Sequence, residues 1–135
     1  MTASDSVRPT ILVSSDSMGQ GNIDDVGRVL AIEMFIALNQ PELTDEEKKA
    51  YNITEPQRLP ETIIFYNSGV NFTLKDSPVL DQLEMLEEKG IDLFIDSVSF
   101  DAYAGDKDDQ PAVGEVVDTY IIQSLILHKR HIITF

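Results

Sequence analysis

A continuous apolar run in the middle of the chain constrains the fold more than any other feature. Residues 62–66 (TIIFY) are β-branched or aromatic, and no charged residue interrupts them. A strand with one face in water alternates apolar and polar residues, whereas an inner strand of a parallel sheet is buried on both faces. The run therefore predicts an inner strand of a parallel sheet, and the turn-forming residues Asn67, Ser68 and Gly69 end it.

Three similar runs predict further strands, and the segments between the runs predict helices. The strands are expected at residues 10–14, 91–95 and 131–135, and the helices at 24–39, 78–89 and 115–129. Residues 96–112 are expected to form a long acidic loop. Strands that alternate with helices predict an α/β fold, here a three-layer αβα sandwich on a mostly parallel sheet of four to five strands.

The chain of 135 residues is the size of one domain. We expect residues 10–135 to form this domain, after a polar and flexible N-terminal segment at residues 1–9. Residues 41–59 differ in character because they are rich in Glu, Asp, Lys and Gln, and they predict a surface insertion. Within it, Thr44 and Glu47 have the spacing of a capping box and indicate one short helix at 44–51.

Charge and cysteine content exclude several classes of function. The chain holds 24 acidic and 10 basic residues, a formal net charge of −14, which repels nucleic acid and anionic membranes. It holds no cysteine, which excludes disulfides, thiolate metal sites and cysteine nucleophiles. With neither a signal-peptide pattern nor an apolar run near the length of a membrane span, we expect a cytoplasmic protein.

Two of the predicted helices are apolar on more than one side. In the helix at 24–39 only Arg28 and Glu33 are charged after the first turn, and the helix at 115–129 is similarly apolar. A helix that is apolar nearly all round needs cover beyond the sheet, and in a domain this small we expect another subunit to supply it. The sequence therefore predicts a homo-oligomer.

Polar residues follow the predicted strands, at the edge where open α/β sheets carry their sites. The candidates are Ser15, Asp16, Met18, Gly19, Asn67, Ser68, Gly69, Asp96, Ser99 and Tyr103. These residues either line a small ligand pocket or only cap helices and form turns, and their types favour the second interpretation.

Other constellations carry weaker signals, and we expect neither a cofactor nor a metal. The Gly19–Gly21 loop before a helix suits a phosphate, but Asp24 stands where a dinucleotide fingerprint needs its third glycine. The acidic residues after position 95 lack the spacing of an EF-hand, and His128 and His131 have no third partner for zinc. No histidine lies in a strand-end loop, so a Ser-His-Asp hydrolase is not expected.

Four stretches together resemble one known family. They are SSDSMGQGN (14–22), LPETIIFYNSGV (59–70), LEEKGIDL (86–93) and AVGEV (112–116). The chain resembles the DsrE/DsrF-like family, and within it the C-terminal domain of YedF-type selenium-metabolism proteins. The resemblance implies a flavodoxin-like αβα sandwich that assembles as trimers or hexamers, with persulfide-carrying cysteines in the loop after the third strand.

The chain departs from that family at the cysteines themselves. The family's two cysteine positions fall on Asp96 and Ser99, and neither side chain can carry a persulfide. The leading hypothesis is therefore a non-catalytic structural or protein-binding subunit of an oligomer. The alternatives are a small-molecule-binding domain and an accessory protein that docks a cysteine-bearing partner in a sulfur or selenium relay.

Overall fold

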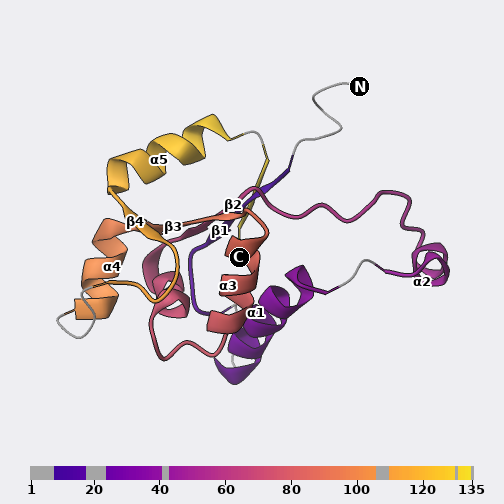
Figure 1. Cartoon of the computed structure of the whole chain (residues 1–135), viewed down its shortest axis with the longest axis horizontal. Coiled ribbons are helices and arrows are strands. Elements are labelled where there is room, and N and C mark those ends of the chain that lie inside the picture. Colours follow the sequence, from indigo (N-terminus) through magenta and orange to yellow (C-terminus); the bar gives the residue numbers. More distant parts are fainter. Residues whose placement is uncertain (1–7, 18–23, 41–42, 106–109, 130, 135) are drawn as a thin grey trace.

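A parallel sheet forms the centre of the molecule (Figure 1). The computed structural model describes residues 8–17, 24–40, 43–105, 110–129 and 131–134. Within them the sheet has five strands in the order β4-β3-β2-β1-β5, and all neighbours are parallel. The strands are β1 (Thr10–Val13), β2 (Thr62–Phe65), β3 (Asp92–Asp96), β4 (Glu115–Val117) and β5 (Ile132–Thr134). β2 is the middle strand and all four of its residues are buried, which confirms the prediction from its apolar run.

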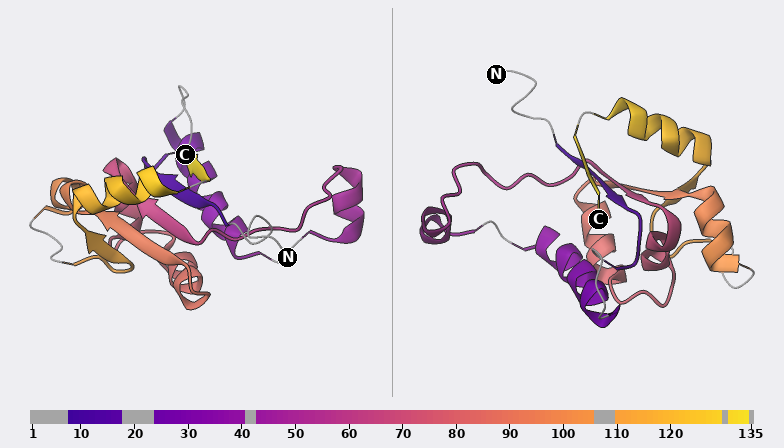
Figure 2. Two further views of the ribbon diagram at one scale, coloured as in Figure 1. Left: turned by 90° about the horizontal axis from the view of Figure 1, so that it is seen from above. Right: turned by 180° about the vertical axis from the view of Figure 1, so that it is seen from behind.

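The helices lie on both faces of this sheet in unequal numbers. From β1 to β4 the chain steps in one direction, and right-handed crossovers place the intervening helices on one face. These are α1 (Asp24–Leu38), the 3₁₀ helix η2 (Asn67–Thr73), α3 (Leu80–Glu88) and α4 (Ser97–Ala104). The return from β4 to β5 carries α5 (Thr119–His128) across the opposite face, so the fold is a three-layer αβα sandwich (Figures 1 and 2). No helix among the described residues has the length and apolar character needed to cross a bilayer.

The larger part of the core lies between the sheet and α1, α3 and α4. Phe35 of α1 is fully buried, and its ring centroid lies 6.2 Å from that of Phe65 on β2 and 5.1 Å from that of Phe72 on η2. On the opposite face α5 buries Ile122, and β2 contributes Ile64. The single helix of this layer leaves Leu12 and Phe94 only half-buried.

Two elements differ from the sequence-based expectation. Residues 115–117 form β4 rather than the first turn of a helix, and α5 begins only at Thr119. The segment after β3, expected as a loop, forms α4, which buries Phe100 and Ala104 against the core. Both errors have one cause, because β4 and α4 are too short to show a clear period of their own.

Residues 43–58 leave the body of the molecule and are called the arm from here on. The arm contains the helix α2 (Asp45–Ala50), which Thr44 and Glu47 start with a complete capping box, as predicted. α2 has no buried residue, and every residue of the arm except Lys48 is exposed. Figures 1 and 2 show α2 standing well away from the sheet and from the other helices.

Candidate functional site

The carboxyl edge of β1, β2 and β3 brings most of the predicted candidate residues into two neighbouring clusters. β2 pairs with both β1 and β3 in register, so the segments that follow Val13, Phe65 and Asp96 emerge side by side. Met18 and Gly19 belong to the predicted set but lie outside the described residues.

The first cluster is centred on Asp96, the last residue of β3, and is called the Asp96 cluster. Asp96 is 2% exposed, and its Oδ2 atom accepts hydrogen bonds from the Ser99 backbone N–H at 2.9 Å and the Ser99 hydroxyl at 2.6 Å. Its Oδ1 atom accepts from the Thr119 hydroxyl at 2.5 Å. Asp96 thereby caps the N-terminus of α4, where a carboxylate is stabilised by the free N–H groups of the first turn.

The segment after β2 completes this cluster through its backbone. The Asn67 N–H donates to the Ser99 hydroxyl oxygen at 2.8 Å. Asn67 has a φ of +54°, a left-handed conformation that Asn tolerates better than most residues. The Ser99 hydroxyl therefore donates to a carboxylate and accepts from an amide, and both partners hold it in place.

Gly69 lets η2 lie directly against β1. A Cβ atom at this position would lie 2.1 Å from the carbonyl oxygen of Val13 and 2.9 Å from its carbonyl carbon. Such contacts are far shorter than van der Waals separations, so only glycine fits while β1 keeps its position. Gly69 thus has a packing role that brings the loops after β1 and β2 together.

The second cluster joins those two loops. The Asp16 backbone N–H donates to the Ser68 hydroxyl oxygen at 3.2 Å, and the Asn71 amide donates to the Asp16 carboxylate at 3.2 Å. Ser15 makes a local turn instead, because its hydroxyl oxygen accepts from the Ser17 N–H at 3.1 Å. These contacts tie the start of the loop after β1 to η2.

A cleft of about 320 Å³ opens next to the second cluster. Its polar lining comes from Asp16, Arg28, Asn71, Asp76, Ser77 and Tyr103. Its apolar lining comes from Phe72, Leu74, Pro78 and Ala104. A cavity of this volume accommodates a small metabolite, and the charged groups of both signs at its wall suit a polar one.

The structure therefore divides the predicted site. Asn67, Asp96 and Ser99 meet in the Asp96 cluster, whereas Asp16 and Tyr103 line the cleft, which Asp96 and Ser99 do not line. Sequence reasoning missed Thr119, Asn71, Arg28, Asp76 and Ser77. Thr119 was not predicted as a site residue because the sequence of β4 was assigned to a helix. Had β4 been recognised as a strand, the position of Thr119 just after it would have indicated a site residue.

The chemistry open to the Asp96 cluster is limited. In the Ser-His-Asp arrangement a histidine lies between the serine and the carboxylate and takes the proton of the serine. The chain's two histidines lie at the other edge of the sheet, since His128 ends α5 and His131 directly precedes β5. The cluster joins the ends of β2 and β3 to the starts of α4 and α5.

The comparisons with known proteins identify the fold. The chain superposes on the crystal structure of the YchN protein from E. coli with a TM-score of 0.58 and 12% sequence identity. The match covers 96% of this chain and 100% of the YchN chain. No family model and no curated protein matches the sequence. The chain therefore has a DsrE-like, flavodoxin-like α/β fold.

Proposed function

We propose that this protein is a non-catalytic DsrE-like domain of the YedF type that serves as a structural or protein-binding subunit of a cytoplasmic homo-oligomer. The observation that carries the proposal is the hydrogen bonding of Asp96 and Ser99, which stand where the resemblance places the family's cysteines. Asp96 and Ser99 direct their polar groups at each other, at Thr119 and at the Asn67 backbone. A closed set of hydrogen bonds with no thiol supports a structural role better than a sulfur-transfer role.

Exposed apolar side chains support the oligomer. On α1, Val26, Val29 and Leu30 are each about half exposed, at 50%, 53% and 51%. Their spacing of three and four residues puts them on one face of the helix. An uncovered apolar face of this kind is typical of a surface that another subunit covers. The resemblance makes a trimer or a hexamer the expected assembly.

Two measurements on the intact chain test this proposal. Size-exclusion chromatography with light scattering should give the mass of an oligomer at micromolar concentration, and a monomer would refute the subunit role. An assay of sulfur transfer from thiosulfate or an organic persulfide to cyanide should give the rate of the buffer alone. Turnover above that rate would refute the non-catalytic role.

The cleft favours a second candidate function, the binding of a small polar molecule. Arg28 provides a cation and Asp16 and Asp76 provide carboxylates to the same cavity. A thermal-shift screen of nucleotides, amino acids, thiols, and sulfur and selenium oxyanions measures such binding, because a ligand of the native state raises the melting temperature. The variant Arg28→Ala should abolish any shift that depends on an anionic group. If no compound in the screen shifts the wild type, this candidate is withdrawn.

An accessory role in a sulfur or selenium relay remains a prediction from the resemblance alone. In that role the protein would dock a partner that itself carries the reactive cysteine. Pull-down from the native cytoplasm is its test, and recovery of no sulfur-relay protein would count against it.

A further inference from the structure

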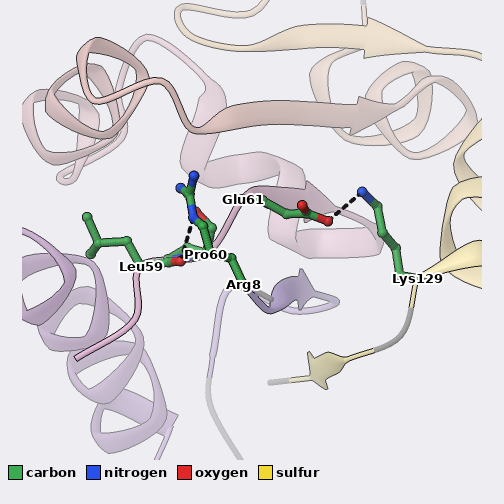
Figure 3. Close-up of polar contacts among 5 residues, drawn as sticks. All are labelled: Arg8, Leu59, Pro60, Glu61 and Lys129. Carbon is green, nitrogen blue, oxygen red and sulfur yellow. Dashed lines mark hydrogen bonds and ion pairs between the residues drawn. The ribbon is translucent and has the colours of Figure 1, made fainter. Parts of the chain in front are cut away.

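Hydrogen bonds hold the chain on either side of the arm, whereas α2 in the middle of the arm has no buried residue. At its C-terminal end, Arg8 Nε donates to the Leu59 carbonyl at 3.0 Å and Arg8 Nη2 to the Pro60 carbonyl at 2.5 Å (Figure 3). Glu61 then pairs with Lys129 at 2.8 Å, and its backbone N–H donates to the Pro9 carbonyl at 3.0 Å. These contacts fix the point at which the arm joins the body.

The other end is held by contacts between α1 and α3. The side-chain amide of Asn39 donates to the backbone carbonyl of Gln82 at 2.9 Å and to its side-chain oxygen at 3.0 Å. Lys89 Nζ donates to the Asn39 side-chain oxygen at 3.0 Å. The chain is thus fixed at Asn39 and again at residues 59–61.

The arm is poorly suited to stand alone in water. Helices shorter than about 12 residues are marginal without tertiary packing, and α2 has six. The arm also presents three large apolar side chains to solvent, Leu43 at 43%, Tyr51 at 75% and Ile53 at 39% exposure. Both features are explained if a surface outside its own body packs against the arm.

A surface of matching character exists on the same chain. Among the described residues, the three most exposed large apolar side chains are Leu127 at 83%, Tyr51 at 75% and Tyr120 at 71%. Tyr51 belongs to the arm, and the other two lie on α5, the single helix of its layer. Leu127 follows Tyr120 by seven positions, which is close to two helical turns and places both on the outer face of α5.

The geometry and charge point to a second copy rather than to the arm's own α5. Although Lys129, directly after α5, pairs with Glu61 at the root of the arm, Figures 1 and 2 show residues 53–58 leading α2 away from α5, so the arm does not cover its own α5. Of the chain's 24 acidic and 10 basic residues, the arm holds four and three, so it is nearly neutral on a strongly acidic protein. A nearly neutral arm can approach another copy with little repulsion.

We infer that the arm of one subunit packs across the outer face of α5 of a second copy, with Tyr51 seated beside Tyr120 and Leu127. This inference rests on the proposed oligomer and names the surfaces that build it. Because the arm and α5 are different surfaces, the contact is heterologous, and it closes into a ring where the rotation between subunits permits.

The absence of cysteine allows a direct test by engineered disulfides. The full-length variants Tyr51→Cys and Leu127→Cys are purified reduced, mixed at micromolar concentration and oxidised with copper phenanthroline. The control mixture pairs Tyr51→Cys with Val98→Cys, since Val98 on α4 is 64% exposed. A disulfide requires Cα atoms within about 7 Å, so only true neighbours pair efficiently. We expect a mixed disulfide in the first mixture and none above background in the second.

A second measurement covers the case in which the two cysteines lie close but are badly oriented. Light scattering over a dilution series gives the dissociation constant of the wild type, of Tyr51→Ser and of the control Val98→Ser. An aromatic anchor at the centre of an interface predicts that Tyr51→Ser weakens association about tenfold or more and that Val98→Ser leaves it unchanged.

The outcomes separate this inference from the proposed function. A wild-type oligomer that Tyr51→Ser weakens supports the arm as part of the interface, and the mixed disulfide with Leu127→Cys supports α5 as the surface that it contacts. A wild-type oligomer that Tyr51→Ser leaves intact overturns the arm contact and leaves the subunit role standing. Equal cross-linking of Tyr51→Cys to both partner variants also overturns it. A wild-type monomer refutes the oligomer itself, and the arm contact with it.

Discussion

Replacing Asp96 by alanine tests whether the Asp96 cluster holds the carboxyl edge of the sheet together. The substitution removes an acceptor that is 2% exposed and leaves one backbone N–H and two hydroxyls without it. Losing the cap of α4 costs about 1 kcal/mol. Each buried donor left without a partner costs about 1–3 kcal/mol, although the Ser99 and Thr119 hydroxyls can rotate toward other acceptors.

These contributions are not additive, because removing Asp96 also removes the cost of keeping a charge buried. We therefore expect Asp96→Ala to lower the free energy of unfolding by about 3 kcal/mol. With a urea m-value of about 2 kcal/mol/M for a domain of this size, the urea midpoint should fall by about 1.5 M. Asp96→Asn keeps one acceptor oxygen and should cost less than the alanine variant.

Urea unfolding followed by circular dichroism measures these changes, at a protein concentration where all variants have the same mass by light scattering. The matched control is Asp92→Ala, since Asp92 begins the same strand but is exposed, and this variant should change stability by less than about 0.5 kcal/mol. A loss below about 1 kcal/mol for Asp96→Ala would refute the reasoning. A loss of equal size in the control would do the same, because it would show a general effect of charge.

Three further predictions concern the same edge and the arm. Gly69→Ala should lower the free energy of unfolding by more than about 2 kcal/mol in the same assay, because its Cβ would lie 2.1 Å from a β1 carbonyl oxygen; an unchanged midpoint would contradict this. Hydrogen bonds from the backbone and hydroxyl of Thr44 hold the pKa of Glu47 below its usual 4.5. The stability that the capping box contributes is therefore fully present above pH 4.5 and is lost as the pH falls through the lowered pKa. An NMR titration of the Glu47 carboxylate measures this pKa, and Thr44→Ala should raise it. A thiol introduced as Ser99→Cys would be buried beside a carboxylate, so it should react with a disulfide reagent about 100-fold more slowly than one at the exposed position Val98→Cys; equal rates would mean that the site is open.

The parts of the fold that sequence predicted share a physical basis. β1, β2 and β3 are largely buried between helices, so each contains an uninterrupted run of three apolar residues that can be recognised in the sequence. The capping box of α2 was also predictable, because its hydrogen bonds join residues only three apart. Buried strands and hydrogen bonds between residues close in sequence can therefore be predicted from the sequence alone.

The missed features depend on contacts between distant segments. β4 shows exposed and half-buried residues because it is an edge strand of three residues, and its two valines continued the apolar pattern of α5. The bond between Thr119 and Asp96 joins residues 23 apart, and its existence depends on the turn between β4 and α5. The cleft likewise takes residues from α1, η2 and α4, whose relative placement no single motif specifies.

The Asp96 cluster and the uncovered apolar surfaces together favour an assembly role over a catalytic one. Ser99 and Asp96, where the resemblance places the family's cysteines, satisfy each other's hydrogen bonds in the interior. Among the described residues, exposed large apolar side chains lie on α1, on α5 and on the arm, and further ones lie on α3, α4, β4 and β5. Since free energy for association comes mainly from burying apolar groups, these surfaces suit the proposed assembly.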